Sequence, residues 1–188
     1  MEFECGGTRY SFTFGFFAVL ALWLLCDRTG IGLPVLGGVV VHEGGHILVM
    51  RLTGARILAM RFCAVGVQLE KRGLLPYGRE AAVYLGGVAA NLLAAAVSIL
   101  CCGWNCFAAV NLALCCFNLL PVGRLDGGVL LGLALCRAGR PDRAVFWQKL
   151  AGFTVLTPLF AAALLLLPRG NYTMLLTALY LAVTLLRE

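Results

Sequence analysis

The sequence predicts an all-α polytopic membrane protein with about six transmembrane helices and a short membrane-surface β-strand or hairpin loop between the second and third. Its 188 residues are 61% hydrophobic and 13% charged, against about 45–50% and 25% in soluble domains. Six apolar stretches fill most of the length, and each is long enough, or nearly so, to cross about 30 Å of hydrocarbon as a helix. A soluble monomer is therefore excluded. We expect one domain over residues 1–188, with its core at about 31–136.

The expected spans lie at about 11–26, 31–50, 80–102, 105–136, 146–167 and 171–186. The first is short for a transmembrane helix. The fourth is too long for one straight helix, and Pro121, Gly123 and Gly127–Gly128 lie where it would have to bend or unwind. We therefore expect a break inside the fourth span.

The connection between the second and third spans, residues 51–79, is the only sizeable loop. Residues 54–62 and 65–70 mix β-branched, aromatic and charged residues with partial alternation, and a turn-like segment follows them. This pattern predicts one or two short strands at the cytoplasmic membrane surface. An amphipathic interfacial helix is the alternative.

The basic residues indicate how the spans are oriented. The formal net charge is +6, which in a membrane protein reflects basic cytoplasmic loops rather than a nucleic-acid partner. Twelve of the fifteen Lys and Arg residues fall on one side of the expected spans, Arg28 and Arg169 fall on the other, and Arg124 lies within a span. We therefore expect a multi-pass protein in the lipid bilayer, with both termini in the cytoplasm.

Both histidines of the chain belong to one motif, His42-Glu43-Gly44-Gly45-His46, inside the second span. Their i, i+4 spacing places both imidazoles on one helical face, where neutral nitrogens can bind zinc and Glu43 can act on zinc-bound water. Ionisable residues inside a bilayer are costly unless they face the protein interior and have a function. The motif therefore predicts a zinc site. The alternative is two histidines that only pack against neighbouring helices.

The third zinc ligand has to come from another span, because a catalytic site normally has three protein ligands and an open fourth position. Asp126 is the one acidic residue well inside the remaining apolar spans. His46 lies five residues before Arg51 and Asp126 lies eleven before Arg137, so both can lie in the cytoplasmic half of the bilayer. We expect Asp126 to be this ligand. A turn aspartate before two glycines is the alternative.

Together these motifs resemble those of the site-2 proteases, a family of intramembrane zinc metalloproteases. The resemblance covers about Gly37 to Gly128 and rests on an HExxH helix plus an NxxPxxxLDG segment. It implies that His42, His46 and Asp126 are the ligands of Zn²⁺ and that Glu43 is the general base. It also implies regulated intramembrane proteolysis, the hydrolysis of peptide bonds in membrane-embedded or membrane-associated proteins.

Within this family the small chain is most similar to compact bacterial members of the stage IV sporulation protein FB type. That similarity implies a location in a bacterial cell membrane and a role in sporulation. The substrate would be a membrane protein or a membrane-associated pro-protein, and the family allows for an inhibitory membrane partner.

Two asparagines, Asn91 and Asn118, are candidates for binding the substrate backbone or stabilising the oxyanion. They can equally cross-link helices. Asn91 ends the segment from Gly87, which resembles the family's GPxxN segment with Val88 in place of proline. Arg124 is a departure from the family pattern, and the sequence does not assign it a role.

Two other classes of function compete with a protease. A catalytically silent zinc-binding membrane scaffold would have no use for Glu43 as a base. A metal or solute transporter would be expected to show further polar residues along a path across several spans, and an internal repeat, and the sequence has neither.

Overall fold

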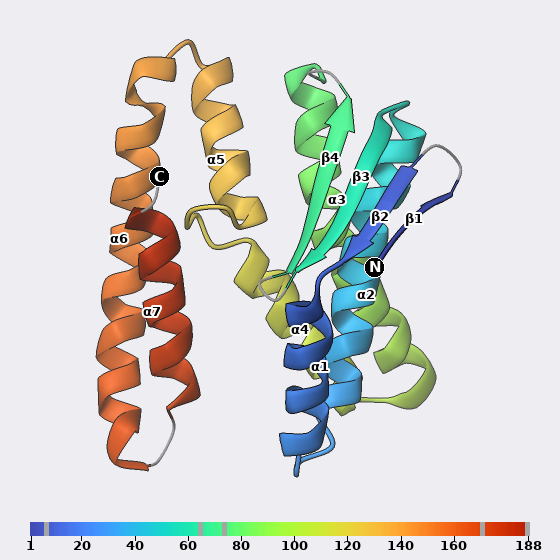
Figure 1. Ribbon diagram of the computed structural model, residues 1–188. Coiled ribbons are helices and arrows are strands. Elements are labelled where there is room, and N and C mark those ends of the chain that lie inside the picture. Colours follow the sequence, from blue (N-terminus) through green and yellow to red (C-terminus); the bar gives the residue numbers. More distant parts are fainter. Residues whose placement is uncertain (6–7, 64–65, 73–74, 170–171, 187–188) are drawn as a thin grey trace. The chain divides into compact units, whose positions relative to one another are not determined.

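The computed structural model describes residues 1–188 except 6–7, 64–65, 73–74, 170–171 and 187–188 (Figure 1). The chain divides into two compact units, Met1–Cys115 and Cys116–Glu188. The elements in chain order are β1 (Glu2–Cys5), β2 (Thr8–Phe12), α1 (Phe14–Cys26), α2 (Gly32–Leu52), β3 (Arg56–Cys63), β4 (Gly66–Arg72), α3 (Tyr77–Cys102), α4 (Cys106–Asn118), α5 (Asp126–Arg137), α6 (Pro141–Leu166), the 3₁₀ turn η1 (Leu167–Arg169) and α7 (Thr173–Leu186).

Three of the described helices, α2, α3 and α6, are both long and apolar enough to cross a membrane. The helices α1, α4 and α7 are also apolar but have only 13, 13 and 14 residues, about 20 Å of helix. Large apolar side chains are exposed over much of the surface, and α1 has no buried residue. These features support a location in a membrane. Of the six expected spans, three have full membrane-spanning length.

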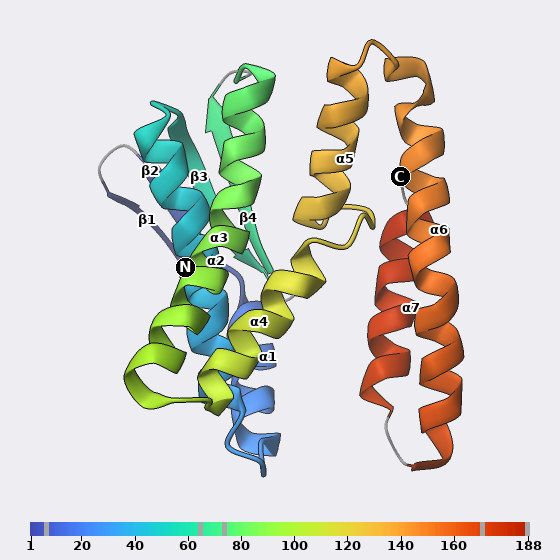
Figure 2. The same cartoon turned by 180° about the vertical axis from the view of Figure 1, so that it is seen from behind.

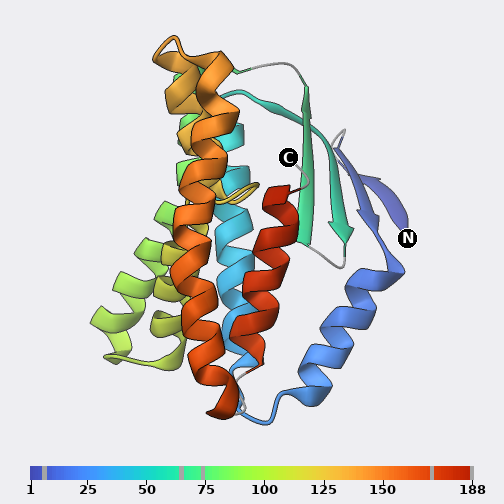
Figure 3. The ribbon, with the colours of Figure 1, turned by 90° about the vertical axis from the view of Figure 1, so that its left-hand side faces the viewer.

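The first unit carries a four-stranded sheet in the order β1-β2-β3-β4 (Figure 3). The pairs β1–β2 and β3–β4 are antiparallel, and β2–β3 is parallel. The hairpin of β3 and β4 lies between α2 and α3, with Phe62 opposite Val67. The predicted strands in this loop are therefore confirmed, and the alternative of an interfacial helix is wrong.

The chain is mostly helical, as predicted, but its strands are not confined to the loop between α2 and α3, because the N-terminal residues also form strands. Residues 2–5 and 9–12 alternate polar and apolar side chains, a pattern with the period of a strand. In the β1–β2 pair Phe3 lies opposite Tyr10 with their rings stacked at 5.1 Å, and Glu4 lies opposite Arg9. Cross-strand aromatic pairs and opposite charges both stabilise a sheet.

Thr13 connects the sheet to α1. Its hydroxyl donates to the Phe62 carbonyl at 3.0 Å and also accepts from the Phe16 amide at 3.4 Å, which caps the helix. The first apolar helix therefore begins at Phe14 rather than at residue 11, because Ser11 belongs to β2.

The expected break in the fourth span is confirmed. The helix α4 ends at Asn118 and α5 begins at Asp126, with Pro121 and Gly123 in the connection. Gly123 has φ of 49°, a left-handed conformation that side chains disfavour. This connection places Asp126 at the first position of a helix.

The second unit is built from α5, α6 and α7. The helix α6 begins at Pro141 rather than near residue 146, because proline fits the first helical position and Asp142 complements the helix dipole. The buried core of the second unit consists of Val122, Leu156, Leu181 and Leu185, which come from the connection before α5 and from α6 and α7. This core is wholly aliphatic.

Candidate metal centre

His42 and His46 lie in the middle of α2, and each exposes only 7% of its surface. Because they are four residues apart, both imidazoles project from one face of the helix. That face is turned toward α3, which runs beside α2 (Figure 2). The two Nε2 atoms are 3.1 Å apart, and the rings are perpendicular. The structure thus brings the predicted pair together with one nitrogen of each ring facing the other.

Glycines allow α2 and α3 to approach this closely. A Cβ on Gly45 of α2 would overlap the carbonyl oxygen of Gly86 on α3. A Cβ on Gly87 would lie 2.5 Å from His46 Nε2 and 2.8 Å from His42 Cε1. Any side chain at position 87 would therefore displace the imidazoles.

Each imidazole is oriented by a hydrogen bond at its other nitrogen. His46 Nδ1 lies 2.8 Å from the Val83 carbonyl oxygen, which can only accept, so Nδ1 carries the proton. His42 Nδ1 lies 2.7 Å from Asn91 Oδ1. The Asn91 amide is oriented by its Nδ2, which donates to the Gly38 carbonyl at 3.0 Å, so Oδ1 accepts from His42. Both neutral rings therefore carry their proton on Nδ1.

This arrangement fits a metal ion. With the protons on Nδ1, each Nε2 presents a lone pair, and the two Nε2 atoms are 3.1 Å apart. Two nitrogen ligands on a tetrahedral zinc ion at 2.0–2.1 Å are about 3.3 Å apart. A hydrogen bond at the remote ring nitrogen is also usual for metal-binding histidines. The donor atoms, tautomers and spacing therefore suit zinc.

Glu43 follows His42 directly and is partly buried. At 100° per residue along a helix, its side chain leaves α2 in a different direction from His42. Glu43 is thus adjacent to His42 in the sequence, but its side chain does not lie on the face of α2 that carries the two histidines.

Asp126 lies in the second unit, where it is the first residue of α5 and exposes 7% of its surface. Within the described part of the chain it is the only buried carboxylate. A carboxylate in the first helical turn is stabilised by the helix dipole. A Cβ on Gly127 would overlap the Leu119 carbonyl, so this glycine allows the connection to fold back on the helix start.

The asparagines occupy different positions from one another. Asn91 is completely buried, and its side chain joins α2 to α3. Asn118 is the last residue of α4 and is partly buried. A third asparagine, Asn111, is not among the candidates predicted from the sequence; it is completely buried and accepts from Asn91 Nδ2 at 2.8 Å. Its signal was the same as that of Asn91, a single amide inside an apolar helix.

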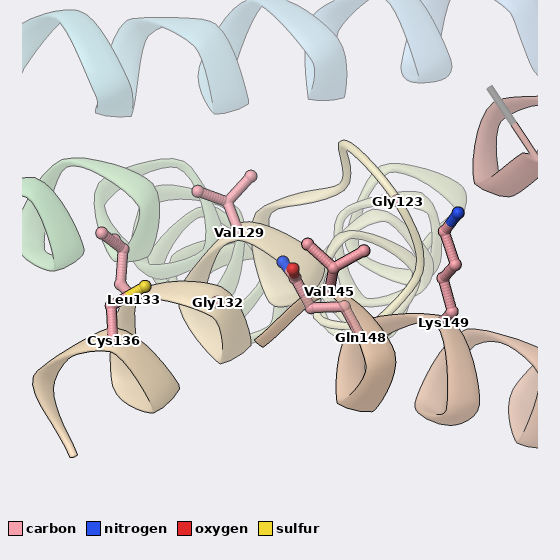
Figure 4. Close-up of a pocket in the computed structure, with 8 residues that line it drawn as sticks. All are labelled: Gly123, Val129, Gly132, Leu133, Cys136, Val145, Gln148 and Lys149. Atoms are coloured by element: carbon pink, nitrogen blue, oxygen red, sulfur yellow. The ribbon is translucent and has the colours of Figure 1, made fainter. Parts of the chain in front are cut away.

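A cavity of about 380 Å³ lies between α5 and α6 in the second unit (Figure 4). Its walls are mostly apolar, and Gln148 in its lining donates to the Gly128 carbonyl at 2.9 Å. None of the predicted zinc ligands or the predicted base lines this cavity.

Comparison with known proteins finds a similar structure but no similar sequence. No family profile matches the chain, and no curated protein matches it. Among solved structures, the chain is similar to a site-2 protease from Methanocaldococcus jannaschii, with a TM-score of 0.69 and 18% sequence identity over 100% of this chain and 94% of that one. The chain therefore has the fold of that site-2 protease.

Proposed function

We propose that this protein is an intramembrane zinc metalloprotease of the site-2 protease type. The observation that carries the proposal is the pair of buried histidines on α2, with Nε2 atoms 3.1 Å apart and Glu43 between them in the sequence. The fold shared with a site-2 protease supports it. The sporulation-type assignment stays a prediction, because the similar structure is described only as a site-2 protease.

We infer that His42, His46 and Asp126 hold one zinc ion through two imidazole nitrogens and one carboxylate oxygen. All three are buried, and two histidines with a carboxylate are a donor set of catalytic zinc sites. A bound zinc ion supplies Lewis acidity, which polarises a peptide carbonyl and lowers the pKa of water. Glu43 takes the proton from the attacking water and passes it to the leaving amine.

The proposed substrate is a membrane-embedded or membrane-associated protein, because the histidine pair lies in the middle of a helix of membrane-spanning length. A transmembrane helix satisfies its own amides, so the substrate has to be extended before attack. The strand β4 lies at an edge of the sheet in the described chain. We propose that the extended substrate pairs with this edge through backbone hydrogen bonds.

The zinc and base assignments are tested by co-expressing the full chain with candidate single-span substrates and measuring zinc in the purified variants. We expect Glu43→Gln to keep zinc and to lose cleavage by about 10²–10⁴-fold. His42→Ala and Asp126→Ala are expected to lose both zinc and cleavage. Equal zinc loss in Glu43→Gln and His42→Ala would show that the roles are wrongly divided. Full zinc retention in Asp126→Ala would exclude Asp126 as a ligand.

Strand addition is tested with two adjacent proline variants. Successive residues of an antiparallel strand direct their N–H groups alternately toward the partner strand and away from it. The backbone N–H of one of the two residues Val67 and Gln68 therefore points toward β3, and the N–H of the other points toward the open edge of the sheet. Proline at the outward residue removes only an edge donor, so cleavage should fall while zinc and thermal stability stay normal. Proline at the other should also reduce stability, and the matched alanine variants should be near normal. Normal cleavage by both proline variants would exclude pairing at β4.

The membrane topology stays a proposal: a multi-pass protein of the bacterial cell membrane with both termini in the cytoplasm. Reporter fusions at Glu188 and accessibility labelling near Met1 test it, and labelling of either end from outside the cell would contradict it. An inhibitory membrane partner is likewise a proposal.

The competing proposal, a zinc-binding scaffold without activity, has the same ligands but gives Glu43 no task. It predicts that Glu43→Gln behaves like the wild type in every assay. The cleavage comparison above therefore also separates the two functions.

A further inference from the structure

We propose that Asn111 is a positioning residue for the metal ligand His42 and that it acts through Asn91. The inference rests on the proposed zinc site. The three residues come from α4, α3 and α2, and all lie in the first unit. Asn111 itself is separated from His42 by the Asn91 amide, so it does not act as a ligand.

The hydrogen bonds between these residues run in one direction. Asn111 Nδ2 donates to the Phe107 carbonyl at 2.8 Å, one helical turn earlier. Because a carbonyl only accepts, this bond turns Asn111 Oδ1 toward Asn91, whose Nδ2 donates to it at 2.8 Å. Asn91 Oδ1 then faces His42 Nδ1 at 2.7 Å and accepts its proton. A backbone carbonyl of α4 thus sets the tautomer of a histidine on α2.

The Asn91 amide has two hydrogen donors and uses both. One bonds the Gly38 carbonyl at 3.0 Å and the other bonds Asn111 Oδ1. If this amide turned over, its oxygen would face two acceptors and its NH₂ group would face His42 Nδ1. That orientation favours the His42 tautomer with the proton on Nε2, which has no lone pair there for a metal. Asn111 therefore opposes the tautomer that cannot bind zinc.

Burial makes this contact strong. Both asparagines expose none of their surface, and away from water a lost hydrogen bond is not replaced by solvent. The helix α4 also packs closely against α2 at Gly38. A Cβ added to this glycine would lie 2.8 Å from Leu114 Cδ1 and 3.3 Å from Val110 Cγ1. Asn111 therefore cannot easily move away from Asn91.

The test measures zinc affinity of the purified full chain by competition with a chelator, together with the visible spectrum of the Co²⁺-loaded protein and thermal stability without metal. Asn111→Ala removes both bonds. Asn111→Ser is the milder variant, because a hydroxyl can still donate to the Phe107 carbonyl, as Thr53 and Thr154 do to the carbonyls four residues before them. We expect both to bind zinc about tenfold more weakly and to change the Co²⁺ spectrum.

The matched control is Asn105→Ala. Asn105 directly precedes α4, bonds Ser98 and accepts from the Ala108 amide, and none of these hydrogen bonds involves His42. Its loss should lower thermal stability without changing zinc affinity. An equal loss of zinc affinity in the Asn105 and Asn111 variants would mean that any weakening of α4 acts on the site, and would overturn the positioning role.

A double-mutant cycle tests whether Asn111 acts through Asn91. Asn91→Ala alone should weaken zinc binding by about 10–100-fold. Adding Asn111→Ala to it should weaken binding no further, whereas independent effects would multiply and overturn the proposal. Zinc binding that depends on His42 but not on Asn111 overturns the positioning role alone. Absence of His42-dependent zinc binding in the wild type overturns the proposed zinc site as well.

Discussion

The interiors of the two units are built from different side chains. In the first unit, α2, α3 and α4 meet at a polar seam, which consists of Gly38, His42, His46, Asn91 and Asn111. In the second unit, the core is formed by aliphatic residues of α6, α7 and the connection before α5. One interior is held by directed hydrogen bonds between closely approaching helices, and the other by side-chain packing.

The difference predicts where the protein tolerates change. Small residues and interhelical hydrogen bonds hold membrane helices in one geometry, because backbone positions and bond directions must both be satisfied. Aliphatic cores can repack around a change of volume and lose stability without losing their topology. We therefore expect substitutions in the polar seam to affect the proposed zinc site first, and substitutions in the aliphatic core to affect stability first.

The largest expected effect comes from the same substitution made in both units. Gly87→Ala places a methyl group 2.5 Å from His46 Nε2, so zinc affinity should fall by about 100-fold or more. Gly152→Ala, in the second unit, meets the end of the flexible Leu185 side chain at 2.7 Å. It should reduce stability by about 1–3 kcal/mol and leave zinc affinity unchanged. Chelator competition and thermal unfolding measure both quantities. Equal zinc loss in both variants would remove the distinction between the units.

A substitution that creates a cavity in the aliphatic core tests the same comparison in the second unit. Leu181 exposes 1% of its surface, and Leu181→Ala should lower the free energy of unfolding by about 2 kcal/mol. Zinc content at a temperature where the variant is folded should match the wild type. A variant that is folded but has lost zinc would show that this core also determines the geometry of the metal site.

The smallest effect is expected at the polar cluster in the turn between α1 and α2. Its hydrogen bonds lie at the surface, so their loss can be compared with the loss of hydrogen bonds in the buried polar seam. Asp27 accepts from the Thr29 hydroxyl, the Gly32 amide and the Thr29 amide, and these bonds lower the pKa of Asp27 below its ordinary 3.8. A lowered pKa means that the carboxylate stabilises the fold above pH 4 and loses this effect as the pH falls through the folded-state pKa.

Because Asp27 is at most partly buried, Asp27→Asn should change the melting temperature at pH 7 by only about 2 °C. The gap between variant and wild type should shrink as the pH is lowered below 4. A gap that is constant from pH 7 to pH 3 would show that ionisation of Asp27 does not stabilise the turn between α1 and α2.

The sequence by itself determined the features that depend on neighbouring residues. The i, i+4 spacing placed His42 and His46 on one helical face, alternation marked the β3–β4 hairpin, and Pro121 with Gly123 marked the break before Asp126. Each of these patterns is read over less than twenty residues, so local backbone geometry is enough to interpret it.

Only the tertiary structure decided the features that join distant segments. The parallel pairing of β2 with β3 links residues about 50 positions apart, and Asn91 bonds His42 across 49 positions. The roles of Gly87 and Asn111 likewise depend on what lies opposite them on another helix. A glycine or an asparagine in an apolar helix has the same appearance in the sequence whether it faces lipid or a buried histidine, because helix packing, not local pattern, selects its neighbour.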